Sequence, residues 1–350
     1  MFKPRSWQRR ILTVAVISVI AYVTFQTTMS YLTEREAARI KAITPTEVSS
    51  TALQRLDIER MMADVTWLAA SEREGRGIGT QGGLAARQWI AEQFQAIGLV
   101  PAGSDGYLQP FSVPEHNNWS RLLRGRNVKI AGIEGAANVL GMLPGTQAGL
   151  NPIVITAHYD HLGSKDGKIF HGADDNASGV ATMLALARYF QQQPLRHPLL
   201  FVALDAEERG LQGAYALFRE SFLDPKQLAF NVNVDMLSRD TNKLLYAVGT
   251  YQQPWLKPVL AEIQKVSQAK LLLAHDRPWY VAGRTEDWSL SSDHGAFNQH
   301  GVPFIYFGVA DHEDYHSPRD TADKVDVAFY HQVSETVLSF IETLDVALLQ

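Results

Sequence analysis

Four short apolar runs in this chain are each followed by acidic or imidazole side chains, and this pattern constrains the fold more than any other feature. The runs have the length of buried strands and lie at residues 152–156, 199–204, 230–234 and 303–307. The side chains that follow them, in chain order, are His158, Asp160, Glu207, Glu208, Asp235 and His316. In open α/β sheets, ligands bind beyond the carboxyl ends of the strands. The pattern therefore predicts a metal site at one sheet edge, with ligands enough for two ions.

From residue 152 onward, the expected strands alternate with helices expected at 178–192, 211–219 and 255–268. This alternation is typical of a mostly parallel sheet with helices on both faces. Further upstream, apolar spacing predicts helices at 51–70 and 84–97, and short runs at 107–113, 128–133 and 138–143 predict strands of a first meander. No linker follows residue 50. We therefore expect residues 51–350 to form a single three-layer α/β domain with a mixed, mostly parallel central sheet.

The N-terminus has the pattern of a membrane segment. Basic residues within positions 1–10 precede an uncharged stretch at 11–32, which reaches the ~20 residues needed to cross a bilayer. No convincing small-residue cleavage site follows, which favours an uncleaved signal anchor over a cleaved signal peptide. The basic flank predicts a cytoplasmic tail at 1–10 and a catalytic domain in the periplasm or exterior, on a single-pass protein of the inner membrane. The polar residues 33–50 are expected to form a stalk.

Composition excludes several classes of function. The net charge is -5, and no basic block follows the first ten residues, so nucleic-acid binding has no support. The chain has no cysteine, which excludes disulfides, thiolate catalysis and cysteine-ligated zinc. Any metal must be held by imidazole and carboxylate groups, a ligand set that suits catalytic zinc.

A loop of small residues at 171–179 carries Asp174 and Asp175 directly before an expected helix. A pair of catalytic metal ions about 3.5–4 Å apart needs a carboxylate that bridges them. Because such a loop can fold close around ions, we expect Asp174 to be the bridge. The alternative is that these acidic residues cap the helix N-terminus.

The other acidic residues can each have a role in a metal site or a purely structural role. Asp160 lies two residues after His158 and can orient its imidazole ring as a hydrogen-bonding carboxylate, or the two residues can have a structural role only. Glu207 and Glu208 follow a strand, so their side chains are expected to diverge, with one ligating a metal and the other acting as a general base. Alternatively they form a solvated helix N-terminus.

Other side chains near these positions are expected to be neighbours of the ligands or part of the pocket. Four residues next to the ligands are predicted to form hydrogen bonds rather than to ligate: His161, His171, His312 and Asp175. Aromatic residues gather between positions 251 and 288, where they can line a substrate pocket or simply pack in the core.

Across residues 51–345, the chain resembles the co-catalytic di-zinc exopeptidases of peptidase family M28, typified by bacterial leucyl aminopeptidases. The most specific motifs are GADDNASG at 172–179, AHYDHLG at 157–163 and EERG at 207–210. EGRGIGT at 74–80, NVLGMLPG at 138–145, SDH at 292–294 and YHSPRDTAD at 315–323 add to the likeness.

The resemblance implies a role for each residue. His158 and Asp235 would hold one zinc ion, Glu208 and His316 a second, and Asp174 would bridge the two. Glu207 would act as the general base, and Asp160 would orient His158. The implied function is that of a membrane-anchored, zinc-dependent aminopeptidase that removes N-terminal residues from peptides with a free N-terminus, through a hydroxide bridging two Zn²⁺. The alternatives are another amidohydrolase on the same scaffold, such as a glutaminyl cyclase or an acyl-amino-acid hydrolase, and a non-catalytic receptor-like protein.

Overall fold

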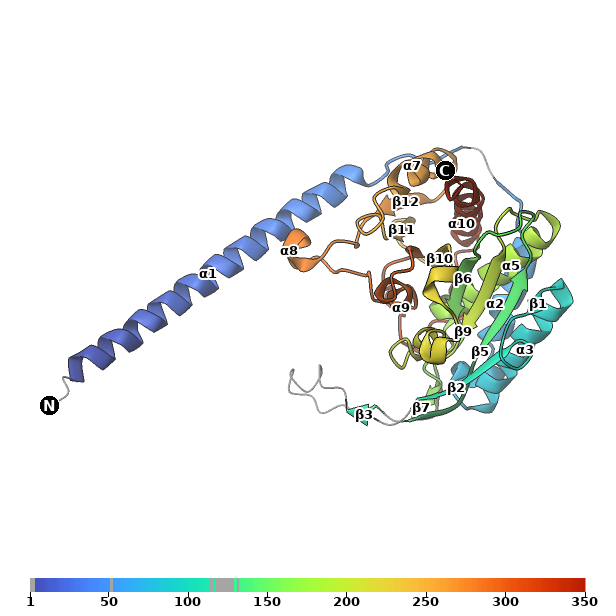
Figure 1. Ribbon diagram of the computed structural model, residues 1–350, viewed down its shortest axis with the longest axis horizontal. Helices are drawn as coiled ribbons and strands as arrows, with labels where there is room; N and C mark the ends of the chain where they lie inside the picture. Colours follow the sequence, from blue (N-terminus) through green and yellow to red (C-terminus); the bar gives the residue numbers. More distant parts are fainter. Residues whose placement is uncertain (1–3, 51–52, 114–115, 118–128, 131, 350) are drawn as a thin grey trace.

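The computed structural model describes residues 4–50, 53–113, 116–117, 129–130 and 132–349. A long N-terminal helix, α1 (Pro4–Ile43), projects from an α/β domain that contains the rest of the described chain (Figure 1). The C-terminus lies on that domain, at the end of helix α10 (Val327–Ala347).

Nine strands of the described chain form the central sheet, in the order β1-β5-β9-β6-β10-β13-β11-β12, with β2 also paired to β5. Their bounds are β1 (Val100–Pro101), β2 (Leu108–Val113), β5 (Ile133–Leu143), β6 (Ile153–His158), β9 (Leu199–Leu204), β10 (Phe230–Val234), β11 (Leu244–Val248), β12 (Lys270–Leu273) and β13 (Phe304–Gly308). The adjacent strands β9, β6, β10 and β13 are mutually parallel, whereas β5 and β11 run antiparallel to this central group. The mixed, mostly parallel sheet that the sequence predicts is confirmed, and its central strands are the four apolar runs.

Helices cover both faces of the sheet, so the prediction of three layers is confirmed. One face packs against α2 (Ile58–Leu68), α3 (Gln81–Ile97), α5 (Gly179–Gln192), α7 (Leu256–Val266) and α10. The other face packs against α6 (Gln212–Ala216) and α9 (His294–Gln299). Every residue of β6 and β9 is buried, because alternate side chains enter the two apolar layers.

Shorter elements connect these layers. They are the ribbons β3–β4 (His116–Asn117, Lys129–Ile130) and β7–β8 (Ser164–Lys165, Lys168–Ile169), helix α8 (Trp279–Ala282), and the helical turns η1 (Ser71–Arg76), η2 (Ala173–Ser178), η3 (Arg219–Ser221), η4 (Pro225–Gln227) and η5 (Ala322–Lys324). The strand expected at 128–133 is divided: positions 128 and 131 lie outside the described residues, 129–130 form β4, and position 133 starts β5.

The first part of the segment expected to form a polar stalk at 33–50 belongs to a helix that contacts the domain. Helix α1 continues to Ile43, and its C-terminal half packs on α8 and β12. Glu36 is only 2% exposed, and its carboxylate accepts a 2.8 Å hydrogen bond from Nε of Arg39 and lies 3.5 Å from Nη1 of Arg277. Residues 33–43 are polar, but they consist mainly of Ala, Glu, Arg, Lys and Ile, of which the first four are good helix formers.

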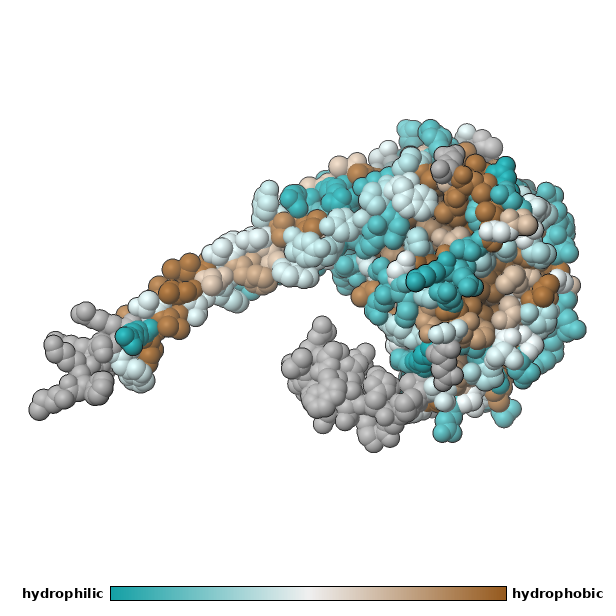
Figure 2. Space-filling view, in the orientation of Figure 1, coloured by the Kyte–Doolittle hydropathy of each residue, from teal (hydrophilic) through white to brown (hydrophobic). Residues whose placement is uncertain are grey.

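The N-terminal half of α1 is apolar and exposed. Within the described residues, one helix is long and apolar enough to cross a membrane, and it is this one, from Arg10 to Ile43. Leu12 is 66% exposed and Ile20 is 60% exposed. Figure 2 shows hydrophobic side chains along this projecting segment, where the protein itself offers them no partner surface.

Candidate metal centre

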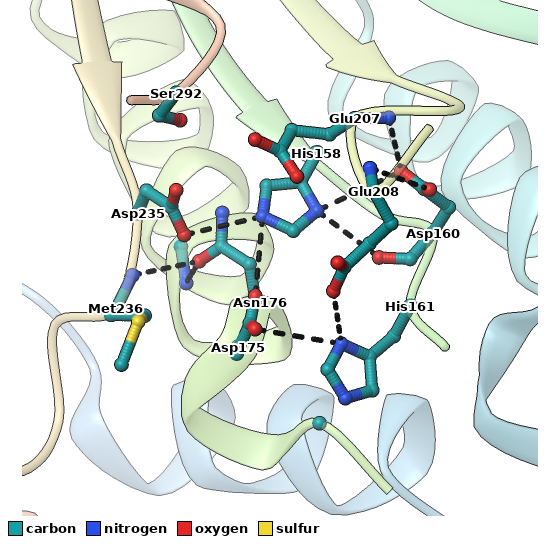
Figure 3. A network of polar contacts seen from close by, with 12 residues as sticks. His158, Asp160, His161, Asp175, Asn176, Glu207, Glu208, Asp235, Met236 and Ser292 are labelled. Atoms are coloured by element: carbon teal, nitrogen blue, oxygen red, sulfur yellow. Dashed lines mark hydrogen bonds and ion pairs between the residues drawn. The ribbon is translucent and has the colours of Figure 1, made fainter. Parts of the chain in front are cut away.

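The carboxyl ends of the central parallel strands bring the predicted ligands together at one edge of the sheet. β6 ends at His158, β9 leads into Glu207 and Glu208, and β10 leads into Asp235. The loop after β13 returns to the same edge with His316, and the turn before α5 contributes Asp175. Figure 3 shows side chains from these separate segments pointing toward one another.

The first half of the cluster is centred on His158, whose side chain is 1% exposed. Its Nε2 lies 3.2 Å from Oδ1 of Asp235 and 3.3 Å from Oδ1 of Asp175. These three residues present one ligand atom each within 4.8 Å of one another. They form a buried group with the chemistry of a metal site.

The second half is built on the other carboxylate oxygen of Asp175. Its Oδ2 lies 3.1 Å from Nε2 of His316 and 3.6 Å from Nδ1 of His161. Glu208 completes the group, with Oε2 3.3 Å from Nε2 of His316 and Oε1 2.8 Å from Nδ1 of His161. Asp175 therefore faces both halves with one oxygen each, which is the arrangement of a bridging carboxylate.

Asp174, which the sequence suggested as the bridge, does not point into the cluster. Its Oδ1 accepts hydrogen bonds of 2.7 Å from both the backbone N–H and the hydroxyl of Ser238, and one of 3.2 Å from the hydroxyl of Ser178. Its Oδ2 lies 3.2 Å from Nε2 of His312. The expectation for Asp174 is corrected: this side chain braces the loop, and its neighbour Asp175 faces the cluster instead, because the backbone dihedral angles are non-helical at Asp175 and Asn176.

Asp160 holds two parts of the site in place. Nδ1 of His158 lies 3.1 Å from the backbone oxygen of Asp160 and 3.7 Å from its carboxylate. The same carboxylate accepts hydrogen bonds from the backbone N–H groups of Glu207, at 3.0 Å, and Glu208, at 3.4 Å. Asp160 thus connects the loop after His158 to the turn that carries Glu207 and Glu208.

The side chains of Glu207 and Glu208 diverge, as Figure 3 shows: Glu208 points to His161, and Glu207 points to the side of His158. They follow Ala206, whose φ of 62° is left-handed and directs the chain sharply out of the strand. Burial raises the pKa of Glu207 well above its ordinary value; His158 opposes this, and Asp293 adds to it.

Two residues that contribute to the site were not singled out from the sequence. Asp293, from the SDH motif, is fully buried, neither of its carboxylate oxygens has a hydrogen-bond partner among the described residues, and burial raises its pKa well above the ordinary value. Arg76, from the glycine-rich loop, is also fully buried, and burial lowers its pKa to about 10. Its guanidinium donates to the backbone oxygens of five residues: Leu68, Tyr159, His171, Gly172 and Asp175.

The donor set fits zinc. Zinc–nitrogen and zinc–oxygen bonds of ~2.0–2.1 Å in tetrahedral geometry place ligand atoms about 3.3 Å apart. The contacts of His158 with Asp175 and Asp235 are 3.3 and 3.2 Å, and those of His316 with Asp175 and Glu208 are 3.1 and 3.3 Å. All of these groups are imidazoles or carboxylates, so a dication would also balance their concentrated negative charge.

A cavity of about 660 Å³ opens on Asp235. Aromatic side chains of Trp288, Tyr306 and Tyr315 line it together with the acidic residues Glu286 and Asp287. The aromatic stretch noted in the sequence therefore contributes Trp288 to this cavity. In contrast, Trp255 packs edge-on against the core residue Phe230.

Known structures share this fold. BSAP, a zinc aminopeptidase from Bacillus subtilis, superposes with a TM-score of 0.63 at 16% identity, covering 83% of this chain and 95% of that chain. A glutaminyl cyclase from Porphyromonas gingivalis superposes with a TM-score of 0.62 at 17% identity, covering 83% and 99%. At such identities the likeness establishes the fold alone.

Sequence comparison supplies the family. YfbL, an uncharacterized protein of Escherichia coli (strain K12), is 29% identical over 223 residues, or 54% of this chain and 66% of that protein. Aminopeptidase YwaD of Bacillus subtilis (strain 168) is 25% identical over 196 residues, or 54% of this chain and 40% of that protein. The chain thus spans less than two thirds of the length of either relative. Residues 138–341, more than half of the chain, match the model of peptidase family M28. The resemblance seen in the sequence is confirmed, and this chain belongs to peptidase family M28.

Proposed function

We propose that this protein is a zinc-dependent aminopeptidase held in a membrane by α1. One observation carries the proposal: two imidazole–carboxylate groups meet on the two oxygens of Asp175, with Glu207 beside them. Family membership and the names of the relatives agree with this chemistry. A receptor-like protein on this scaffold would not need a full ligand set around a free carboxylate base.

His158 and Asp235 would hold one ion, and Glu208 and His316 the other, with Asp175 between them. Two bound zinc ions would lower the pKa of a water molecule toward ~7 and polarise the scissile carbonyl group. Glu207 would take a proton from the attacking water and deliver it to the departing amine, a role that its position beside His158 allows. Asp160 keeps His158 and the turn that carries Glu207 and Glu208 in place.

The substrate class follows from the cavity beside Asp235. Its aromatic walls suit an apolar side chain, and Glu286 and Asp287 provide negative charge for a positively charged N-terminal amine. An acetylated N-terminus would leave these acceptors without that partner, at a cost of about 1–3 kcal/mol. We therefore propose peptides with a free N-terminus as substrates.

Metal dependence is the direct test of this chemistry. Dialysis against a chelator should abolish hydrolysis of a leucyl peptide, and added zinc should restore it, with metal analysis reporting two ions per chain. Full activity in a metal-free preparation would refute the proposal.

Substrate form separates the aminopeptidase from its alternatives. A leucyl peptide, its N-acetylated form and a peptide with N-terminal glutamine should be compared by mass spectrometry. Release of the first residue from the free peptides alone supports the aminopeptidase. Cleavage of the acetylated peptide would favour an acyl-amino-acid hydrolase. Ring closure without cleavage would favour a cyclase, a function that the fold match to a glutaminyl cyclase makes worth testing.

The apolar segment of α1 supports the membrane part of the proposal. Residues 11–32 would span the inner membrane once, with the basic tail at 1–10 in the cytoplasm and the catalytic domain in the periplasm or exterior. Cell fractionation should place the full chain with membranes, and added protease should cleave the catalytic domain only after the outer barrier of the cell is opened. A soluble native protein that starts near Ser30 would indicate a cleaved signal peptide instead.

A further inference from the structure

His161 is positioned differently from the other histidines near the cluster. Its side chain is fully buried, and neither ring nitrogen has a hydrogen-bond partner among the described residues. Nδ1 lies 2.8 Å from Oε1 of Glu208, yet the pair lacks hydrogen-bond geometry, and Oε1 is likewise without a partner. Buried polar atoms normally have a hydrogen-bond or metal partner, so these two atoms, which face each other without bonding, are both free to bind a third group.

The surroundings identify that species as a cation. Nδ1 of His161 also lies 3.6 Å from Oδ2 of Asp175, and the three residues offer ligand atoms within 4.8 Å of one another. The ring is held there by its packing: a Cβ atom on Gly172 would lie 2.6 Å from ring atoms of His161. A water molecule could bond Nδ1, but a metal ion satisfies the carboxylates and the imidazole together.

We propose, building on the di-zinc function above, that His161 is a fourth protein ligand of the ion held by Asp175, Glu208 and His316. The two ions then have unequal coordination. Three protein side chains would hold the ion at His158 and leave a position open, whereas four would hold the ion at His161, the number found in closed zinc sites. The His161 ion should consequently be retained longer under chelation.

His161→Asn separates ligation from hydrogen bonding. The asparagine amide occupies the place of Nδ1 and offers an N–H group to Glu208, but it is a poor zinc ligand. We expect the affinity for one of the two ions to fall by more than the ~10–100-fold that loss of an outer hydrogen bond causes. The visible spectrum of the Co²⁺ form should also change. His171→Asn is the matched control, because Nδ1 of His171 donates to the backbone oxygen of Ala69 at 2.8 Å, and this variant should keep two ions at unchanged affinity.

Measurements on the unmodified protein guard against a folding defect in the variant. X-ray absorption at the zinc edge should report three imidazoles shared by two ions if His161 ligates, and two if it does not. Two imidazoles, or an Asn variant that binds both ions with unchanged affinity, would overturn this inference while leaving the di-zinc function intact. Fewer than two ions in the unmodified protein would overturn both.

A second, independent observation concerns the junction of α1 with α8. The backbone N–H of Arg284 donates to Oγ1 of Thr33 at 2.8 Å, and Nη2 of Arg35 donates to the backbone oxygen of Val281 at 3.1 Å. A Cβ atom on Gly283 would lie 2.4 Å from Oγ1 of Thr33, so the two segments are in tight contact. Helix α8 is thereby fixed beside the end of the uncharged span 11–32.

Helix α8 presents two large aromatic side chains at this level. Trp279 and Tyr280 are each 60% exposed. Both are amphipathic residues of the kind that favour the membrane–water interface. Two arginine side chains of the same segment contact α1, with Arg284 hydrogen bonded to Gln26 and Arg277 close to Glu36. If residues 11–32 span the bilayer, these groups lie at the depth of the lipid headgroups.

We infer that α8 is a second membrane contact, in which Trp279 and Tyr280 insert into the interface beside α1. This contact rests on the proposed membrane anchor. It would fix the orientation of the catalytic domain on the bilayer, instead of leaving the domain to swing on a tether.

The absence of cysteine makes the test direct, since a single introduced cysteine carries the only label. Trp279→Cys, Ile20→Cys and Val100→Cys would each be spin labelled in the full chain, reconstituted in vesicles of phosphatidylethanolamine and phosphatidylglycerol. Ile20 lies in the span, and Val100 is 56% exposed on the side of the domain away from α1 (Figure 1).

We expect the ratio of oxygen to nickel-chelate accessibility at position 279 to be several-fold above that at position 100 and below that at position 20. Equal ratios at 279 and 100, with position 20 in lipid, would overturn the α8 contact alone. A water-exposed label at position 20 would overturn the anchor as well.

Discussion

The carboxyl edge of the sheet and the α1–α8 junction hold their residues by different means. At the sheet edge, the ligand-bearing loops are fixed through backbone groups, as when Asp320 accepts hydrogen bonds from the N–H groups of Asp174 and Asp175. At the junction, partly exposed side chains reach across to backbone atoms, as Arg39 does to Leu273. The first arrangement fixes atoms to fractions of an ångström, as catalysis needs, whereas the second fixes the placement of a domain. Changes at the edge should therefore affect chemistry, and changes at the junction should affect stability and location.

The largest effect is expected for Glu207→Gln. A general base contributes ~10²–10⁴-fold, so kcat should fall by about that factor while both metal ions remain bound. Kinetics and metal analysis on the same preparation provide the measurement. Glu208→Gln is the comparison, and it should lose metal instead. If both variants kept their metal and lost equal, small amounts of activity, the division of roles between these neighbours would be wrong.

The adjacent pair Asp174 and Asp175 tests the site at its most sensitive point. Asp175→Asn removes the carboxylate that faces both halves, so neither ion should bind tightly. Asp174→Asn only loosens the bonds to Ser238, and we expect a ~10–100-fold loss of metal affinity, as for other groups that orient ligands. Zinc titrations of the two variants compare their metal affinities. A greater loss of affinity in the Asp174 variant would favour Asp174 as the bridge, as the sequence suggested.

Arg76→Met examines how the edge is braced. The change leaves five backbone oxygens without their donor in a buried site, and we expect a loss of at least about 1–3 kcal/mol in the free energy of unfolding. Arg76→Lys keeps the charge but not the planar fork, so its loss should be smaller. Urea unfolding gives both values, and an unchanged free energy for the Met variant would show that the carbonyl groups find other partners.

The sequence predicted those parts of the site that follow directly from strand ends. His158, Glu208 and Asp235 come within a few residues of a buried apolar run, and parallel strands deliver such residues to one edge whatever the loop details. His316 lies eight residues after the end of β13, so its distance from the strand alone did not identify it. The motif YHSPRDTAD that contains it did.

The parts that failed depend on backbone dihedral angles that a residue pattern does not encode. Asp174 and Asp175 are chemically identical neighbours, and the non-helical φ and ψ of Asp175 decide which of them faces the cluster. The proposed role of His161 as a ligand depends on the same kind of detail, because β6 ends at His158 and the chain then turns, so the period of a strand does not apply to it. Arg76 had no signal beyond its place between glycines, because its partners are backbone oxygens on distant segments.

The smallest effect is expected at the junction, where two shortened chains isolate the docked half of α1. A chain that begins at Ser30 lacks the span but keeps Arg35, Glu36 and Arg39, whereas a chain that begins at Thr46 lacks these contacts as well. Both should be soluble and keep their kcat, because neither change reaches the sheet edge. The chain from Thr46 should unfold with a free energy lower by about 1–3 kcal/mol, since it removes the partners of Arg277 and of the backbone oxygens of Leu273 and Val281.

Its KM should also rise, because the segment that carries α8 continues into Glu286, Asp287 and Trp288 of the cavity wall. Chemical denaturation and steady-state kinetics on the two chains measure both effects. Equal stability and equal KM would mean that α1 is a tether and nothing more. A fall in kcat would mean that the junction reaches the metal edge after all, and that the two regions are not built separately.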